Sequence, residues 1–258
     1  VVRYTVGPDI LIGNFEGVAA QTLYTKCKTD SKKCFSFNGD AHFLSRLRDA
    51  SFDVLNIANN HFNDYGETGQ RETLAEIENM NMIPSGMKNT ITYVGRNNIK
   101  VGIIGVSNYT WTTNMLSTKT IEKLILEAKQ NADIVIAIFH AGGEGAKYDH
   151  TPIGTEWYLN ENRGDVRAFA HSAIDAGADV VLGSGPHVLR GMEIYADKLI
   201  AYSLGNFVSS NSVITSGPAK NSAMLNVTFK KDGSLLSGIV FPFEIDPSGI
   251  PHPDINNT

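Results

Sequence analysis

Histidine, glutamate and asparagine side chains follow the apolar runs of this sequence, at the points where predicted strands end. Three histidines occupy such positions: His61, His140 and His187. Imidazole nitrogen and carboxylate oxygen are usual ligands of zinc, manganese and iron, and three histidines at equivalent strand ends are hard to explain by packing. The pattern therefore predicts a polar site that binds a divalent metal, Mn, Zn or Fe, as one or two ions. The predicted ligands are Asn14, Glu16, Asn60, His140 and His187.

Proton transfer and substrate contact are predicted for residues at the same strand ends. His61, His140 and Glu144 are the candidate catalytic residues, since imidazole and carboxylate groups act as general acids and bases. Glu144 could instead be a metal ligand or orient a histidine. The predicted substrate-binding residues are Asn59, Ser184 and Asn206.

Each of these residues also has an ordinary structural explanation. A histidine at the end of a strand often hydrogen-bonds its own loop, and Asn59 and Asn60 could simply hold left-handed turns. Asn206 could simply cap a strand. His42 and His171 lie in helical patterns, so we interpret both as structural residues.

Alternating strand and helix patterns must position these residues. Short apolar runs alternate with segments whose apolar residues recur at helical spacing. The tail differs, because two alternating runs flank Lys231-Asp232-Gly233 and predict a hairpin. This order indicates the α/β class, with a mixed sheet that binds ligands beyond the carboxyl ends of its strands. Strands are predicted at 8–13, 52–58, 100–106, 133–139, 178–182 and 199–204, helices at 41–50, 70–80, 117–130 and 166–176, and the hairpin at 223–229 and 234–243.

An aspartate precedes four of the apolar runs, at Asp9, Asp53, Asp133 and Asp179. The shared position indicates a structural role, in which each carboxylate accepts hydrogen bonds from backbone donors where a strand begins. These four residues are therefore assigned no chemistry.

Other kinds of active site fit the sequence less well. Gly183-Ser184-Gly185 lacks the five-residue elbow of serine hydrolases, and neither phosphate-binding glycine motif occurs. The net charge of −5 over 258 residues is mild and argues against a nucleic-acid partner. No interdomain linker stands out, which predicts a single domain over residues 1–258.

Two features bear on the compartment. No stretch approaches the ~18 consecutive apolar residues that span a bilayer, and Val1 to Thr5 lack the regions of a signal peptide, so any export signal or anchor is expected upstream. Cys27 and Cys34 lie in a loop-like run, and a disulfide between them is predicted, which favours an oxidising compartment. Metal binding by the two thiols, or free thiols in a cytosolic protein, are the alternatives.

The strand-end loops, in this order, resemble the bacterial CapA/PgsA family, the capsule and poly-γ-glutamate synthesis proteins. The resemblance covers about residues 9 to 245, and its motifs are specific when taken together. The matching segments are Asp9 to Gly17, Phe52 to Gly66 with its Ala-Asn-Asn-His core, Asp133 to Gly143, and Gly177 to Phe207 with Pro186-His187-Val188.

The resemblance implies a fold like that of calcineurin-type metallophosphoesterases, a four-layer α/β/β/α sandwich with mixed sheets and a cation site at the sheet edge. It also implies an extracellular or cell-surface bacterial protein. Family members usually begin with a strand ending in Gly-Asp, which nothing before Asp9 matches, and many carry a histidine near Ser184 or Gly185. The positions that match the family's site are Asn14, Glu16, Asn60, His61, His140 and His187.

Two functions are compatible with these features. One is an exported metal-dependent hydrolase of the phosphoesterase type, acting on or around a cell-surface polymer through a bound divalent metal. The other is a non-catalytic component that binds the polymer or the partners of a capsule or polyglutamate synthesis complex.

Overall fold

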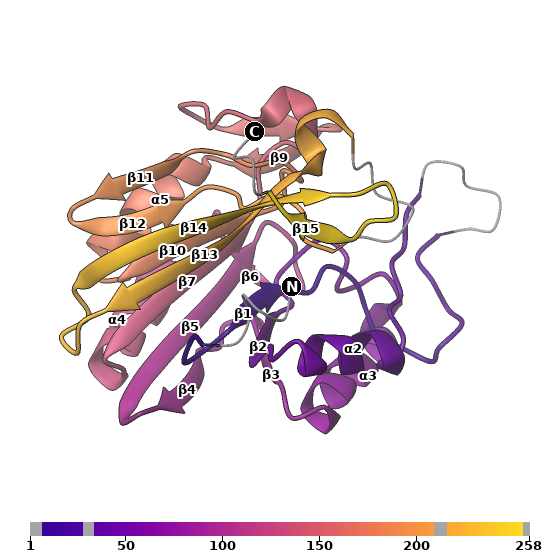
Figure 1. The fold of residues 1–258 in the computed structure, drawn as a ribbon, viewed down its shortest axis with the longest axis horizontal. Coiled ribbons are helices and arrows are strands. Elements are labelled where there is room, and N and C mark those ends of the chain that lie inside the picture. The colour runs from indigo at the N-terminus through magenta and orange to yellow at the C-terminus, as the bar shows by residue number, and fades with distance from the viewer. Residues whose placement is uncertain (1–6, 28–33, 209–215, 255–258) are drawn as a thin grey trace.

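The largest sheet contains the parallel strands that lead to the predicted site. The computed structural model describes residues 7–27, 34–208 and 216–254, and seven of their strands form this sheet (Figure 1). They are β4 (Thr92–Arg96), β5 (Ile99–Ser107), β6 (Thr113–Asn114), β7 (Ile134–His140), β10 (Val180–Ser184), β11 (Met192–Tyr195) and β12 (Lys198–Ala201). β7 lies between β5 and β10 and is parallel to both, and β12 continues the parallel run beyond β10. Antiparallel β4 and β11 lie at the two edges.

The other described strands form three smaller sheets. They are β1 (Ile12–Asn14), β2 (Val54–Asn56) and β3 (Ile83–Ser85); β8 (Glu156–Tyr158) and β9 (Glu161–Gly164); and β13 (Asn221–Phe229), β14 (Leu235–Ile245) and β15 (Pro251–Pro253). β2 is parallel to both β1 and β3, whereas β14 is antiparallel to β13 and β15. β8 and β9 form an antiparallel pair.

Four α-helices and two short 3₁₀ helices are described. They are α2 (Ala41–Asp49), α3 (Gly66–Asn79), α4 (Thr118–Asn131), α5 (Val166–Asp175), η1 (Ala146–Tyr148) and η2 (Gly217–Lys220). Aspartate caps begin two of them: Asp40 accepts a hydrogen bond from Phe43 N at 2.9 Å, and Asp165 accepts one from Ala168 N at 2.9 Å. Each carboxylate satisfies a backbone donor that the first turn leaves free.

Residues of β7 alternate between the two faces of the large sheet, as a strand buried on both sides requires. One face packs against α4 and α5, in a cluster that includes Phe139, Ile125 and Ala170. The other face packs against the β1 and β13 strands, in a cluster that includes Ile136 and Leu225. The large sheet is therefore covered by helices on one side and by strands on the other (Figure 1).

The helices α2 and α3 cover the outer side of the β1–β2–β3 sheet. Leu44 of α2, Ile77 of α3 and Leu55 of β2 are almost fully buried in one cluster. Residues of β2 thus pack on both sides, because Val54 belongs to the cluster shared with the large sheet.

The α/β class with mixed sheets is confirmed, and the tail hairpin is formed by β13 and β14. Some bounds differ from the prediction. The strand predicted at 8–13 begins only at Ile12, because Leu11 N donates to the Asp53 carboxylate rather than to a neighbouring strand. The helix predicted at 70–80 begins at Gly66, because the turn before it runs directly into α3.

The sequence patterns do not predict β4, β11 or the β8–β9 hairpin. In each case a two-residue turn joins the strands, and both residues have positive φ. Such turns match the twist of paired strands, and Asn-Gly or Asp-Gly is their usual signal. The signal is weak here because the turns contain no glycine. The turn residues are Asn97-Asn98 (φ 51° and 63°), Leu159-Asn160 (49° and 65°) and Ala196-Asp197 (47° and 61°).

The structural role predicted for the strand-start aspartates is observed at three of them. Each carboxylate accepts a hydrogen bond from a backbone N–H at the start of a neighbouring strand: Asp53 from Leu11 N at 2.8 Å, Asp133 from Lys100 N at 2.7 Å and Asp179 from Val135 N at 2.8 Å. Asp9 instead accepts a hydrogen bond from the side chain of Asn97.

The predicted disulfide is confirmed, since Cys27 and Cys34 are bonded to each other. Among the described residues, every helix is too short or too polar to cross a bilayer. Val1 to Thr5, to which the signal-peptide prediction refers, lie outside the described residues.

Replacing Asp179 with alanine is expected to destabilise the fold strongly. The Asp179 side chain is 1% exposed and bonds Lys129 Nζ at 2.9 Å and Lys198 Nζ at 2.6 Å, besides the backbone of β7. Removing it leaves the buried Val135 N–H without an acceptor and breaks ion pairs with two partly exposed lysines, which costs about 1–3 kcal/mol. Urea unfolding measures the loss. The control is Asp49→Ala, whose side chain is 59% exposed, and equal losses in the two variants would contradict the prediction.

Candidate metal centre

Three histidines converge on one carboxylate oxygen. Glu16 Oε1 lies 3.5 Å from His187 Nε2, 3.6 Å from His140 Nε2 and 4.0 Å from His61 Nε2. Glu16 follows β1, His61 follows β2, His140 ends β7 and His187 follows β10. The carboxyl ends of parallel strands in two facing sheets therefore meet at one place, as expected for an α/β ligand site.

The other ring nitrogen of each histidine is held by an oxygen acceptor. This arrangement is the one by which proteins orient imidazole ligands of metals. The pairs are His61 Nδ1 with Asp64 Oδ2 at 2.7 Å, His140 Nδ1 with Ser184 Oγ at 3.0 Å, and His187 Nδ1 with Asn206 Oδ1 at 2.8 Å.

These acceptors determine which nitrogen carries the proton in each neutral ring. The Ser184 hydroxyl donates its single proton to Phe139 O at 3.2 Å, so its oxygen must accept a hydrogen bond from His140 Nδ1. The Asp64 carboxylate can only accept, and Asn206 accepts through Oδ1. Each neutral ring is therefore protonated at Nδ1 and presents the lone pair of Nε2 towards Glu16.

Burial and mutual charge shift the pKa values of the cluster. Burial lowers the pKa of His140 from 6.5 to about 4, although Glu16 acts in the opposite direction. Burial also disfavours the charged form of His187, but Glu16 and the hydrogen bond with Asn206 raise its pKa above 6.5. Burial alone would raise the pKa of Glu16, and the charges of the histidines lower it below 4.5. The carboxylate is thus ionised and His140 is neutral at pH 7.

Two buried polar atoms of the cluster make no hydrogen bond within the described residues. They are Glu16 Oε1 and His140 Nε2, which lie 3.6 Å apart. Asn60 Oδ1 is also buried without a hydrogen-bond partner among these residues. Buried polar groups in proteins are nearly always paired, and an unpaired one costs about 1–3 kcal/mol. Nitrogen and oxygen lone pairs that face one another without a donor fit a divalent cation such as Mn, Zn or Fe.

The side chains do not form a ready metal site as they stand. Among the described residues, no group of three His, Cys, Asp and Glu side chains could hold a metal ion in its present geometry. The Glu16 carboxylate oxygen itself lies among the three Nε2 atoms, at 3.5–4.0 Å. Ligand atoms bound to one tetrahedral ion at ~2.1 Å lie about 3.4 Å apart, so the donor spacing is close to that of a site. A shared cation therefore requires these side chains to shift from their present positions.

The other predicted residues lie around this cluster in supporting positions. Asn14 Oδ1 accepts hydrogen bonds from Asn56 Nδ2 at 3.1 Å and from Asn59 Nδ2 at 3.4 Å. Asn59 is fully buried and also bonds Phe15 O and His61 N, so it holds the loops rather than facing open space. The Glu144 carboxylate does not contact the histidines directly but accepts a hydrogen bond from Arg163.

Asp64 and Arg163 are residues of this region that the sequence patterns do not predict. Asp64 is fully buried and accepts hydrogen bonds from both His61 Nδ1 and Phe37 N at 2.7 Å. Its position three residues after His61 is the signal that could have found it. Arg163 lies on β9, whose hairpin gives no strand signal, so nothing in the sequence connects it to the strand ends.

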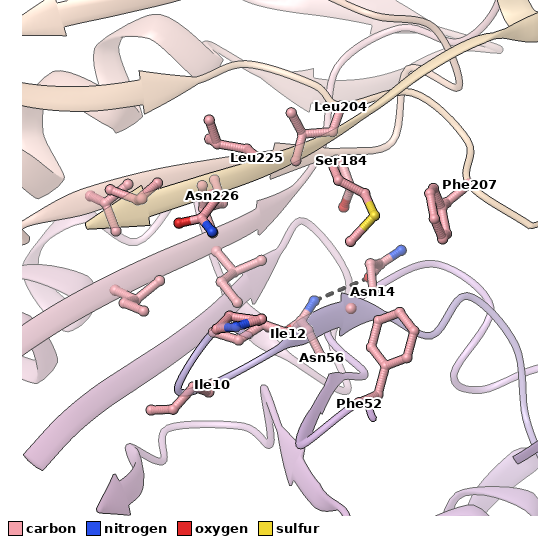
Figure 2. Close-up of a pocket in the computed structure, with 18 of the residues that line it drawn as sticks. Ile10, Ile12, Asn14, Phe52, Asn56, Ser184, Leu204, Phe207, Leu225 and Asn226 are labelled. Atoms are coloured by element: carbon pink, nitrogen blue, oxygen red, sulfur yellow. Dashed lines mark hydrogen bonds between the residues drawn. The ribbon is translucent and has the colours of Figure 1, made fainter. Parts of the chain in front are cut away.

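A cavity of about 650 Å³ extends from the cluster between the two β layers. Figure 2 shows Ile12 of β1 on one side of it and Leu225 and Asn226 of β13 on the other. Glu16 and His187 line the same cavity. The cluster therefore borders a cavity between the two β layers.

The fold is similar to that of two solved structures. A hypothetical protein from Thermus thermophilus matches with a TM-score of 0.60 and 15% identity, over 94% of this chain and 90% of that chain. A candidate 5'-nucleotidase from Staphylococcus aureus, in complex with alpha-ketoglutarate, matches with a TM-score of 0.53 and 14% identity, over 96% of this chain and 54% of that chain. At these identities the likeness shows the fold alone, a mixed α/β fold similar to 5'-nucleotidase chains.

Sequence comparison identifies the family. The chain belongs to the family described as bacterial capsule synthesis protein PGA_cap, which matches residues 1–211. The PGA biosynthesis protein CapA of Bacillus subtilis (strain 168) is 31% identical over 88% of this chain, and the capsule biosynthesis protein CapA of Bacillus anthracis is 29% identical over 98%. The chain spans 59% and 62% of the lengths of these two relatives. The resemblance found in the strand-end loops is confirmed.

Acid is expected to destabilise the metal-free protein through His140. Because burial lowers the pKa of His140 from 6.5 to about 4, unfolding adds a proton to this residue between these values. Stability is therefore present above pH 6.5 and is lost as the pH falls towards 4, by up to about 1.4 kcal/mol per pH unit. Urea unfolding at several pH values in this window measures the slope, which is expected to be shallower in His140→Gln.

The other members of the cluster do not mask this effect. The raised pKa of His187 contributes stability that is already complete below pH 6.5, and the lowered pKa of Glu16 acts only below 4.5. His150→Gln is the control, because that side chain is 94% exposed. A slope in His140→Gln equal to that of the wild type and of the control would show the prediction to be wrong.

Proposed function

We propose that this chain is an exported, metal-dependent hydrolase of the phosphoesterase type that acts on or around a cell-surface polymer in capsule or poly-γ-glutamate synthesis. The observation that carries the proposal is the convergence of three imidazole Nε2 atoms on one carboxylate oxygen of Glu16. Family membership supports the link to capsule synthesis, and the 5'-nucleotidase-like fold supports the reaction type.

The proposal gives each residue of the cluster a role that its contacts allow. Glu16, His140 and His187 would hold the cation, with Asn60 and Asn14 nearby as oxygen donors. The chemistry that such a cation supplies is polarisation of the scissile ester or amide and activation of water. His61 is the farthest of the three histidines from Glu16, at 4.0 Å, and is bonded to a carboxylate, so it is suited to hold or move a proton at Nε2.

A non-catalytic role is the second candidate, in which the chain binds the polymer or the partners of a synthesis complex. It is favoured by the position of the Glu16 carboxylate oxygen, which stands among the histidines so that the side chains form no ready metal site among the described residues. In that case the histidines and Glu16 would hold one another through shared protons, and the site would serve recognition.

The packing supports two structural expectations. Helices, large sheet, second β layer and helices follow one another, which supports the four-layer metallophosphoesterase-like sandwich and a single domain. The Cys27–Cys34 disulfide supports an extracellular or cell-surface location.

Manganese binding and hydrolysis test the two functions together. The wild type is expected to bind Mn²⁺ in calorimetric titration and to hydrolyse a generic phosphoester, p-nitrophenyl phosphate. Glu16→Gln and His140→Ala are expected to lower the Mn²⁺ affinity by at least about 10- to 100-fold, since each removes a donor from the cluster, and to abolish turnover.

The matched control is His150→Ala, because this histidine lies outside the cluster and is 94% exposed. It should bind Mn²⁺ and turn over substrate as the wild type does. Mn²⁺ binding without turnover would favour the recognition role. A wild type that binds no Mn²⁺, Zn²⁺ or Fe²⁺ would refute a metal centre.

A further inference from the structure

Arg163 on β9 carries a buried guanidinium group close to the candidate metal centre. Its side chain is 4% exposed, and a buried charge needs partners for its donors. Nη2 donates to Glu144 Oε1 at 2.7 Å, and Nε lies 3.1 Å from Glu161 Oε2. The rings of Tyr109 and Tyr158 lie 5.9 Å and 5.2 Å from the guanidinium carbon. The group is therefore held in place by an ion pair and by aromatic contacts.

Two nitrogens of this group, Nε and Nη1, are buried and make no hydrogen bond to any of the described residues. Nε has the Glu161 carboxylate as its ion-pair partner at 3.1 Å, and Nη1 is left without an acceptor among these residues. A buried donor on a charged group is costly to leave unpaired, by about 1–3 kcal/mol or more. Such an atom in a folded protein indicates either strain or a missing ligand.

A second buried arginine shows how the same fold satisfies a purely structural guanidinium group. Arg190 bonds both oxygens of Glu156, through Nη1 at 2.8 Å and Nη2 at 2.7 Å, and its Nε donates to Tyr148 O at 2.6 Å. Glu156 in turn accepts a hydrogen bond from Gly143 N at 2.9 Å. Every nitrogen of Arg190 thus has an acceptor, which Arg163 lacks at Nη1.

Two observations place Arg163 next to the metal cluster. Gly142 N donates to Arg163 O at 3.0 Å, so β9 is bonded to the chain two residues beyond His140. Electrostatic coupling agrees: burial raises the pKa of Glu16, the three histidines lower it, and the charge of Arg163 adds to the lowering. Arg163 therefore lies on the chain beside the His140 loop, and its charge reaches the cluster.

We propose that Arg163 binds an oxyanion, the phosphate or carboxylate group of a substrate, beside the metal cluster. A guanidinium group has only donors, and its planar fork matches the paired oxygens of these two groups. A neutral or cationic ligand offers no such match. The inference deepens the proposed function and rests on it, because the positive charge of the bound cation offsets the carboxylates around Arg163.

The nearby carboxylates do not exclude an anion. Glu161 is 49% exposed, so solvent screens its charge, and its oxygen also accepts a hydrogen bond from Tyr109. Glu144 balances the single charge of Arg163 and fixes Nη2, which leaves the other terminal nitrogen free to meet the ligand. The ligand's charge is then balanced by the cation and not by Arg163 alone.

Calorimetric titration of the Mn²⁺-loaded protein with inorganic phosphate, and separately with glutarate, tests the proposal. The wild type is expected to bind at least one of the two, and the preferred probe identifies the oxyanion. Arg163→Met is expected to lower that affinity by about 10- to 100-fold, because a hydrogen bond to a charged group is lost. Arg163→Lys is expected to lower it as well, since an ammonium group lacks the planar fork.

Arg46→Met on α2 is the control, because it removes the same charge from an exposed position. Wild-type oxyanion affinity in Arg163→Met, or full affinity in Arg163→Lys, would overturn the proposal. The proposal also fails if the Mn²⁺-loaded wild type binds neither probe.

Two further measurements keep the result interpretable. Arg163→Met leaves the partly buried Glu144 without its partner, so the double variant Arg163→Met/Glu144→Gln removes both charges, and circular dichroism checks its fold. Mn²⁺ affinity is expected to stay at the wild-type value in Arg163→Lys. A wild type that binds no Mn²⁺ refutes the proposed function, whereas Mn²⁺ binding with unchanged oxyanion affinity in the Arg163 variants refutes only this inference.

Discussion

Lone pairs that face one another are the constraint on which the rest of this structure depends. Three imidazoles present Nε2 to the Glu16 carboxylate at 3.5–4.0 Å, while their Nδ1 protons are committed to Asp64, Ser184 and Asn206. Acceptors so close repel one another unless a positive charge lies between them. The raised pKa of His187 relieves this repulsion in part, because a proton on His187 pairs with the Glu16 carboxylate. A divalent cation would meet the same need for all four groups at once.

Close packing of the two β layers makes this convergence possible. Glu16 and His61 come from the β1–β2–β3 sheet, whereas His140 and His187 come from the large sheet. A Cβ atom added at Gly105 of β5 would collide with Asn56 Oδ1 and with the backbone of Gly86, so no larger residue allows the sheets to approach this closely. The apolar cluster between the layers holds that approach, and the strand-start aspartates fix the neighbouring strands at the opposite end.

The sequence predicts the parts of this arrangement whose signals are local. The apolar runs of β5, β7 and β10, with polar residues directly after them, indicate parallel strands and a site at their carboxyl ends. Convergence on Glu16 is not local, because it depends on how two sheets pack. The hydrogen-bond partners of the histidines are not predicted, for the same reason. The sequence indicates substrate contacts at Ser184 and Asn206. Their positions beside His140 and His187 instead follow from the register of two strands and from a loop that returns to the site. Arg163 is not predicted either, because it lies in the β8–β9 hairpin, whose Leu-Asn turn contains no glycine to signal it.

Charge counting within the cluster bears on what it can bind. With a cation in place of the proton on His187, the set that faces the centre contains one carboxylate, Glu16, and otherwise neutral donors, with His140 neutral at pH 7. A divalent cation held by such a set keeps about one unit of positive charge, whereas a site built from several carboxylates would cancel it. The remaining charge favours an anionic ligand even though the chain carries a net charge of −5. Local charge, rather than the overall balance, therefore decides whether an acidic polymer can reach this site, since surface charges at a distance are screened by salt and those in a buried cluster are not.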